Sequence, residues 1–315
     1  ETNDVISTCY VDYSGRLLYI NSCEEKKEPK VLLESRIEGY SPYNVRLAES
    51  EGSVHAFYII SHNRKQLLTY QKIDGPESMM PEVLGVIIRD GQSYTVSTDD
   101  VNIHLFFLTD VQGINLLVHR KLYGGKASKP ITTPFPYSAS LRLQSVISDD
   151  GLLYILASPD DGQDVSVIYR FDPVLNKFSK GLEVYNSSSG QGSDSLILIN
   201  NNPYVVRSLK SSLILSRISR DIKGIADEAR IDLVGRDILL KCRYQSNYKK
   251  DRAFKCDLTP MLFGNGLHFP FNLKTLMTQK NENETIDSKA FNERIQELEG
   301  RIEFLENTIR EILRP

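Results

Sequence analysis

Few side chains in this sequence have the type and spacing that acid–base or metal chemistry needs. The five histidines stand at positions 55, 62, 104, 119 and 268, and no His-x3-His pair is present to bind zinc. His55 and His104 occupy equivalent places in a repeat described below, where other copies have leucine. Because leucine can fill the same place, we interpret both histidines as packing residues rather than ligands. The histidines therefore predict no metal site.

The four cysteines form two equally spaced pairs, Cys9 with Cys23 and Cys242 with Cys256. Each pair brackets a predicted hairpin, so the thiols could form cross-strand disulfides or could join the first and last repeats. The spacing has no metal-binding signature, and we favour the alternative of reduced thiols packed in the core.

Motifs for nucleophilic catalysis and phosphate binding are absent. The sequence has neither the G-x-S-x-G nucleophile elbow nor the G-x-x-x-x-G-K-[ST] phosphate loop. We therefore assign no catalytic residue and no cofactor. The question of enzymatic activity stays open, with a preference for a protein that is not an enzyme.

The elements that would position these side chains are short strands. Apolar or alternating runs of five to eight residues are separated by turn residues through most of the first 275 positions. The clearest predicted strands cover residues 54–60, 67–72, 83–88, 103–109, 115–122, 152–157, 165–171 and 195–199. No helix of ten or more residues is predicted in this region.

The strands recur at a regular interval. An acidic or glycine-containing turn leads into an apolar and aromatic strand, and the marked position of each copy is residue 18, 55, 104, 153, 204 or 239. The intervals are 37, 49, 49, 51 and 35 residues, an average of about 44. Four of these strands are followed by a further strand, at residues 67–72, 116–121, 167–172 and 213–217. One repeat therefore contains about four strands.

A four-stranded antiparallel unit of about 40 to 50 residues has the size of a propeller blade. We predict an all-β fold with a six-bladed β-propeller, seven blades as the runner-up, and a pair of β-sandwiches as a weaker alternative. Closing the blades into a ring also removes the exposed edges of an open sheet. The repeat architecture resembles that of bacterial-type β-propeller proteins and indicates no single family.

One turn, Ser148-Asp149-Asp150-Gly151-Leu152-Leu153-Tyr154, resembles the Asp-box of sialidases, which also have six blades. Asp149 stands where the motif has its aspartate, but Ile147 replaces the Ser or Thr two residues earlier and Tyr154 replaces the usual Trp. The resemblance implies an alternative function, a sialidase-like glycan hydrolase or a glycan-binding lectin that uses the channel face of the propeller. The chain has no tryptophan, and carbohydrate sites depend on aromatic platforms, which favours protein recognition over sugar chemistry.

A sialidase also gathers three arginines around a carboxylate. Arginines that such a site could recruit lie in different copies of the repeat, and they are Arg46, Arg120, Arg170, Arg207 and Arg217. Because nothing in their spacing brings them together, we interpret them as solvated arginines at strand ends.

The C-terminal segment has a different period. Apolar residues recur at alternating steps of four and three, at Phe291, Ile295, Leu298, Ile302, Leu305, Ile309 and Ile312. This heptad pattern predicts a coiled coil, and Ile at position a with Leu at position d favours two strands, with a trimer as an alternative. The other interpretation is an amphipathic helix packed back on its own propeller.

A parallel register would pair Arg294 with Glu299 and Arg301 with Glu306 between helices, all of opposite charge. An antiparallel register would oppose like charges, so we predict a parallel homodimer. The domains are then a β-propeller at 1–275, a polar linker at 276–285 and a coiled-coil oligomerisation helix at 286–315.

The charge balance limits the partners. With 38 basic and 41 acidic residues the net charge is -3, so no strong field is available to attract nucleic acid. No apolar run reaches the ~18 to 20 residues of a membrane span. We predict a non-enzymatic oligomeric recognition or structural module that binds itself and a protein or surface ligand. Localisation stays open, with a preference for the cell surface or the extracellular space.

Overall fold

The structure is a computed structural model that describes residues 7–21, 28–33, 42–73, 80–88, 93–99, 101–136, 141–159, 165–185, 193–209, 212–232, 240–243 and 261–264. All regular secondary structure in these ranges is β-strand, and the strands form antiparallel sheets. The predicted all-β class is therefore confirmed for the described residues, whose sheets form a propeller-like assembly.

The first three sheets follow one another in the chain. The strands of the first are β1 (Ser7–Val11), β2 (Leu17–Asn21) and β3 (Lys30–Leu33). The second contains β4 (Pro42–Ser50), β5 (Ser53–His62), β6 (Lys65–Lys72) and β7 (Glu82–Ile87). The third contains β8 (Tyr94–Thr98), β9 (Ile103–Val111), β10 (Ile114–Tyr123), β11 (Lys126–Ala127) and β12 (Ile131–Pro134).

The later sheets continue the same order. The fourth contains β13 (Leu141–Ile147), β14 (Leu153–Pro159), β15 (Ser166–Asp172), β16 (Lys177–Phe178) and β17 (Leu182–Tyr185). The fifth contains β18 (Ser193–Ile199), β19 (Asn202–Ser208), β20 (Ser212–Ile218) and β21 (Ile225–Asp232). The last described pairing joins β22 (Leu240–Arg243) to β23 (Met261–Gly264).

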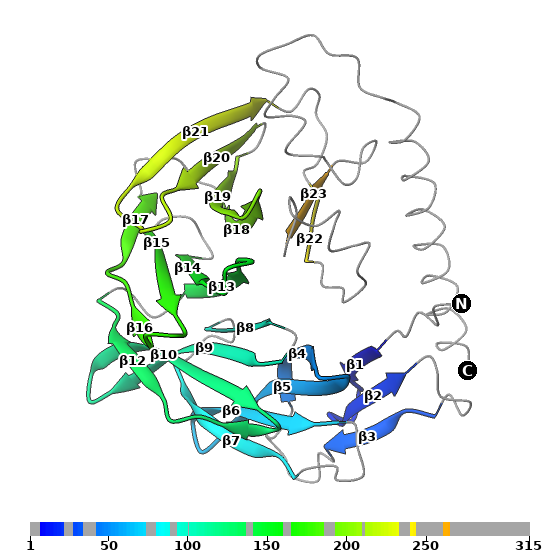
Figure 1. Cartoon of the computed structure of the whole chain (residues 1–315). Coiled ribbons are helices and arrows are strands. Elements are labelled where there is room, and N and C mark those ends of the chain that lie inside the picture. The colour runs from blue at the N-terminus through cyan, green and yellow to red at the C-terminus, as the bar shows by residue number, and fades with distance from the viewer. Residues whose placement is uncertain are drawn as a thin grey trace.

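The sheets are arranged around a central region in chain order (Figure 1). The first strands of the first five sheets contact one another in sequence, β1 with β4, β4 with β8, β8 with β13 and β13 with β18. These five strands are therefore the inner strands of the arrangement. Each sheet then extends outwards, so that β21 forms the outer edge of the fifth sheet.

The predicted repeat corresponds to one sheet. The marked residues Leu18, His55, His104, Leu153 and Tyr204 all lie on the second strand of a sheet, β2, β5, β9, β14 or β19. The strands predicted to follow them are β6, β10, β15 and β20, each the third strand of its sheet. The sixth mark, at residue 239, lies just before β22 and outside the described residues.

Hydrogen bonds between neighbouring sheets join residues one repeat apart. The hydroxyl of Tyr94 donates to the Asn44 carbonyl oxygen, 50 residues earlier. The Oγ atoms of Thr95 and Ser145 are 3.1 Å apart and are also separated by 50 residues. Because equivalent positions of successive sheets face each other, the period in the sequence has a direct structural counterpart.

The hydrophobic core lies between the sheets rather than at one centre. Separate clusters of buried side chains span each pair of neighbouring sheets among the first five, and examples are Tyr19 with Tyr58, Phe57 with Leu105, Phe106 with Tyr169, and Leu156 with Val205. Alternate side chains of one strand contribute to different clusters, as Leu105 and Phe106 of β9 do. The second strands are therefore buried on both faces, which explains their continuous apolar runs.

Tight two-residue turns connect several of the paired strands. Asn200 and Asn201 have φ values of 48° and 61°, and they join Ile199 to Asn202 in the β18–β19 hairpin. Positive φ at both central residues is the geometry of a type I′ turn, which matches the twist of the flanking strands. Asparagine tolerates this conformation, so the turn fixes the register of the hairpin.

The remaining sequence predictions on architecture are not tested by this structure. The heptad residues 291–312, the ion-pair residues 294, 299, 301 and 306, and the linker lie outside the described residues. The blade number, the domain boundaries and the coiled coil therefore stay predictions.

Candidate functional site

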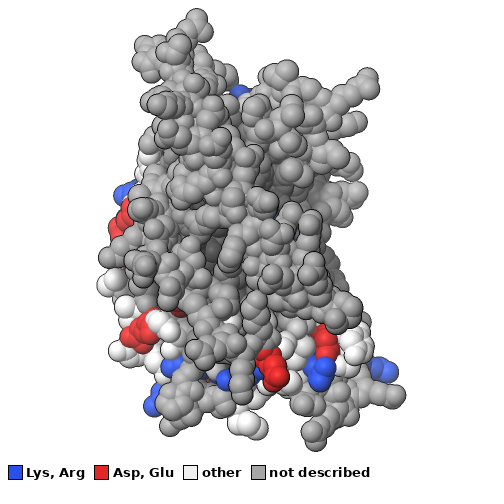
Figure 2. Space-filling model, turned by 90° about the vertical axis from the view of Figure 1, so that its right-hand side faces the viewer, with Lys and Arg blue, Asp and Glu red and all other residues white. Residues whose placement is uncertain are grey.

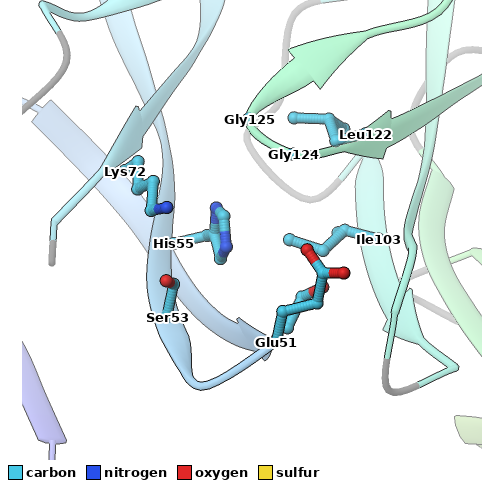
Figure 3. Close-up of a pocket in the computed structure, with 9 residues that line it drawn as sticks. Glu51, Ser53, His55, Lys72, Ile103, Leu122, Gly124 and Gly125 are labelled. Atoms are coloured by element: carbon cyan, nitrogen blue, oxygen red, sulfur yellow. The ribbon is translucent and has the colours of Figure 1, made fainter. Parts of the chain in front are cut away.

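The site best defined by geometry is a pocket between the second and third sheets. It is lined by Ser50, Glu51, Ser53, His55, Lys72, Ile103, Leu122, Gly124 and Gly125. Figure 3 shows His55, Lys72 and Ser53 on one side, facing Ile103, Leu122 and the Gly124-Gly125 turn on the other. The pocket volume is about 20 Å³, which fits one water molecule and is far below the several hundred Å³ of a small-molecule site.

His55 is the most buried ionisable residue of this pocket, at 4% exposure. Its Nδ1 atom lies 2.9 Å from the Tyr70 hydroxyl, and the two rings are stacked. Burial, and after it the charge of Lys72, lowers the pKa of His55 to about 4. The imidazole is therefore neutral at pH 7 and holds β5 against β6, which agrees with the packing role predicted from the sequence.

A second group of ionisable residues lies in the third sheet. His104 Nδ1 is 3.1 Å from His119 Nε2, and His104 Nε2 is 3.3 Å from Asp99 Oδ2. Burial lowers the pKa of His104, and burial together with its neighbours His104 and Lys121 lowers that of His119 to about 3. The chain of contacts resembles an acid–base relay in its residue types.

The last residue of this chain of contacts, His119, packs against aromatic rings and contacts no reactive group among the described residues. The His119 ring lies against Phe171 and Phe106, with ring centroids 4.0 and 4.9 Å away. The Asp99 carboxylate also accepts hydrogen bonds from the backbone N–H groups of Val101 and Asn102. These contacts close the β8–β9 turn and join it to the core of the sheet, so the triad has a structural role.

The buried ion pair between Asp194 and Arg207 is a feature that sequence reasoning missed. Arg207 Nε and Nη2 donate to the two carboxylate oxygens of Asp194 at 2.8 and 2.9 Å. The Arg207 guanidinium also lies 4.2 Å from the centroid of the Tyr185 ring. Arg207 is 0% exposed, so its interpretation as a solvated strand-end arginine is wrong. The two parallel hydrogen bonds and the aromatic contact offset the free-energy cost of removing both charges from water.

Asp194 also links the fourth sheet to the fifth. The Ser166 hydroxyl donates to its carboxylate, and Arg142 Nη2 and Gln144 Nε2 both donate to its backbone carbonyl at 2.9 Å. Gln144 Oε1 in turn accepts from the Leu196 N–H at 3.2 Å. Among the described residues Asp194 is the one buried carboxylate, and all of these contacts are structural.

Of the other candidate arginines, Arg46, Arg120 and Arg170 have separate partners. Arg120 donates to the carbonyl oxygens of Leu84 and Ser128, and Arg170 donates to that of Arg220. Arg46 lies 4.7 Å from the centroid of the Tyr94 ring. These residues occupy different sheets, and the described part of the chain shows no group of three arginines around a common centre.

The Asp-box-like segment forms the β13–β14 turn. Ser148 Oγ bonds to Asp150 Oδ1 and to the Leu152 carbonyl, whereas the Asp149 N–H donates to Asn201 Oδ1 of the next sheet. The carboxylate that closes the turn is therefore that of Asp150 rather than Asp149. Tyr154 is buried. The turn links two strands of the fourth sheet, and its hydrogen bond to Asn201 joins this sheet to the fifth.

Turns from several sheets share one face of the molecule, which we call the turn face. The pocket joins the β4–β5 turn to the β10–β11 turn, and Arg220 of the β20–β21 connection lies 3.5 Å from Asp150. The turn face carries exposed apolar side chains, namely Tyr13, Val101, Tyr123, Val174 and Leu175, with exposures of 102%, 43%, 58%, 86% and 71%. Exposed apolar side chains on turns are a common feature of surfaces that contact a partner.

Metal-binding clusters and membrane-spanning helices are absent from the described residues. Within them, no three His, Cys, Asp or Glu side chains are grouped to bind a metal ion, and no helix has the length and hydrophobicity for a membrane span. Cys9 is a free, half-buried thiol, and burial raises its pKa to about 12. On the side shown in Figure 2, the described acidic and basic side chains are interspersed. Cys23 and Cys256 lie outside the described residues.

Comparison with known proteins identifies no family for this chain. No protein-family model matches it, and no curated protein matches it. Among solved structures it is similar to an ulvan lyase, a polysaccharide lyase, with a TM-score of 0.49, 11% identity and coverage of 85% of this chain and 78% of the other.

It is also similar to a subtype N10 neuraminidase-like protein from A/little yellow-shouldered bat/Guatemala, with a TM-score of 0.41 and 13% identity over 61% of this chain. A puromycin-hydrolysing peptidase of Mycobacterium tuberculosis matches with a TM-score of 0.44 and 14% identity, covering 72% of this chain and 37% of the peptidase. The chain spans 58% and 54% of the lengths of the two neuraminidase-like proteins that it matches. These likenesses assign neither a family nor an activity to this chain.

Proposed function

We propose that the protein is a non-enzymatic, oligomeric recognition module, in which a six-bladed propeller is presented on a parallel coiled coil. The observation that carries the proposal is the turn face, where exposed apolar side chains stand on turns whose backbones are held by hydrogen bonds, such as those accepted by Asp12 in the β1–β2 turn and by Asp172 in the β15–β16 turn. Tyr13 and Val174 are the most exposed of these side chains, at 102% and 86%. Rigid turns bearing apolar groups bind a partner with little loss of conformational entropy.

The described hydrogen bonds support the rigidity of this face. Ser50 Oγ donates to the Val101 carbonyl at 2.6 Å, which joins the β4–β5 turn to the β8–β9 turn. The Asp149 N–H donates to Asn201 Oδ1 at 2.8 Å, which joins the β13–β14 turn to the β18–β19 turn. The partner that suits such a surface is a protein with a complementary apolar patch and mixed charges around it.

Six blades are supported by the six described sheets and by the repeat of about 44 residues. The coiled coil is supported by the heptads at residues 291–312. Joining two or more propellers on one coiled coil raises the effective concentration of their weak binding sites for a shared partner. Avidity is therefore the advantage of the oligomer.

The oligomer is tested by light scattering on the full chain. The wild-type protein is expected to have the mass of a dimer, or of a trimer if three helices associate. Replacing Ile302 and Leu305 together by Asp places charge in the apolar seam of the coiled coil, formed by heptad positions a and d, and is expected to give a folded monomer. The matched control adds the same charge at outward positions, with Gln296→Asp and Asn307→Asp, and is expected to keep the oligomer. An unchanged mass in the seam variant would contradict the proposal.

The non-enzymatic assignment is tested by turnover of a panel of chromogenic glycosides and uronic-acid polysaccharides. No turnover is expected from the wild-type protein beyond that of a heat-denatured sample. Saturable turnover that follows the purified protein through a final column would replace the recognition module by a glycan-active enzyme.

A further inference from the structure

Strand β21 differs from the other outermost strands of the described sheets. It contains eight residues, whereas β3, β12 and β17 contain four each and β7 contains six. It pairs with β20 along its inner edge, and no described strand pairs with its outer edge. Figure 1 shows β21 on the outside of the arrangement of sheets.

The backbone of β21 is regular over most of its length. Its pairing with β20 has one irregularity, at Arg217 and Ile218, opposite the beginning of β21. From Asp227 onwards the register continues without interruption. Residues 226–228 and Arg230 are exposed, while Ala229 and Ile231 are half-buried. A long, regular, exposed edge is a template for a further strand.

Charge on β21 restricts which strand can pair with it. Directly opposed residues of an antiparallel pair share a face of the sheet, and side chains along one strand alternate between the two faces. When two copies of β21 are related by a two-fold axis, the axis must therefore pass through a residue that lies opposite its own copy. Centring on Asp227, Glu228 or Arg230 would oppose each to its own copy, and like charges directly opposed are destabilising. Centring on Ala229 avoids this conflict.

The Ala229-centred register also brings opposite charges together. Glu228 of each strand then lies opposite Arg230 of the other, twice because of the two-fold symmetry, and Asp227 lies opposite Ile231. The small side chain of Ala229 at the centre allows the two backbones to approach. Among the antiparallel registers that pair five or more residues of β21, its sequence is thus self-complementary in the one centred on Ala229.

From this geometry we propose that β21 pairs with β21 of a second copy of the chain, antiparallel and centred on Ala229, to join two propellers into one continuous sheet across the dimer axis. Such a pairing is isologous and closes with two copies, so it favours the dimer over the trimer. The inference rests on the proposed oligomer, because a contact of one strand per subunit is below the size of a stable interface and gains from tethering.

The test is disulfide trapping in the full chain carrying Ala229→Cys, under mild oxidation, at the concentration used for light scattering. The two introduced thiols face each other in the proposed register, so a covalent dimer is expected. The matched control is Asp227→Cys on the same strand. Its two thiols would be four residues apart along the pair, about 13 Å, and are expected to cross-link no more than wild type does through its own four cysteines.

A charge exchange tests the register independently. In the Ala229→Cys background, Arg230→Glu opposes two pairs of like charge and is expected to slow cross-linking about tenfold. Adding Glu228→Arg restores opposite charges and is expected to restore the rate. Thermal unfolding of each variant checks that the fifth sheet remains folded.

The outcomes separate this inference from the proposed function. A dimer by light scattering without cross-linking above the Asp227→Cys control overturns the β21 pairing and leaves the recognition module intact. A monomer by light scattering contradicts the proposed oligomer, and in that case selective cross-linking through the Ala229→Cys thiol at raised concentration still supports the β21 pairing. Equal cross-linking at both positions, or a rate that does not respond to the charge exchange, also overturns it.

Discussion

Buried neutral histidines make the stability of this protein depend on pH. His55, His104 and His119 are 4%, 1% and 2% exposed, and burial is the first cause of the lowered pKa of each. A histidine whose pKa is lower in the folded state binds more protons when unfolded, so the free energy of unfolding falls as the pH falls below about 6.5. The decrease continues until the pH reaches the folded-state value, about 4 for His55 and about 3 for His119.

We expect each of these histidines to remove about 1 kcal/mol of unfolding free energy between pH 6.5 and 5.5. Urea denaturation at pH 7.5, 6.5 and 5.5 measures this slope. His119→Phe keeps an aromatic ring beside Phe106 and Phe171 and is expected to reduce the slope by about a third. His62→Gln, at the partly exposed end of β5, is the matched replacement of a histidine outside this buried group. A stability that does not change over this range would falsify the assignment of buried neutral imidazoles.

The sequence was sufficient to interpret His55 and His104 as packing residues, because leucine occupies the same place in other repeats. It contained enough information for the Asp194–Arg207 pair as well. The Asn200-Asn201 turn sets the register of its hairpin, and counting back from it places Asp194 opposite Arg207. The contacts with Arg142, Gln144 and Ser166 could not be predicted, because they join different sheets and depend on how the sheets pack.

At the scale of elements, close packing between strands depends on a glycine of β7. A Cβ atom added at Gly85 would lie 2.8 Å from Cε2 and Cζ of the Phe107 ring, which belongs to β9 of the next sheet. Phe107 is 3% exposed and has little room to move. We expect Gly85→Ala to destabilise the protein by about 1 to 3 kcal/mol, the typical cost of overpacking a core. Chemical denaturation at pH 7.5 measures the change.

Two further variants show whether the ring contact is the cause. Gly224→Ala is the matched control, since no heavy atom lies within 4 Å of the added Cβ, and it is expected to be close to neutral. Phe107→Leu shortens the facing side chain, so its combination with Gly85→Ala is expected to cost less than the sum of the two single changes. Strict additivity would show that Gly85→Ala acts through the backbone instead.

The second and third strands of the repeats could be predicted because they are buried and apolar. The inner strands β4, β8 and β13 were not among the clearest predicted strands, since they carry polar residues such as Asn44, Thr95, Ser97 and Gln144. In the structure the side chains of Thr95, Ser97 and Gln144 form hydrogen bonds to neighbouring sheets, as Ser97 does to Ser145 at 2.6 Å. A periodicity based on hydrophobicity detects burial against apolar neighbours and does not detect polar contacts between sheets.

For the whole molecule, the period near 50 residues determines how the sheets stack. Contacts such as Arg142 with Asp194 and Asp149 with Asn201 join residues 52 positions apart, so each sheet is stabilised mainly by its neighbours. This dependence on neighbours predicts that the propeller unfolds as one cooperative unit. The proposed coiled coil would instead be stabilised by association between chains.

The propeller and the proposed C-terminal coiled coil, which we call the rod, are therefore expected to unfold independently. In differential scanning calorimetry, the rod transition of the full chain should move to higher temperature as protein concentration increases, because its folded state is an oligomer. Deleting residues 286–315 should remove this transition and give a monomer, while the midpoint of the propeller shifts by no more than about 2 °C, equivalent to about 1 kcal/mol for a domain of this size. If the deletion instead lowers the propeller midpoint by 10 °C or more, the C-terminal helix packs on its own propeller, and the rod is an intramolecular element.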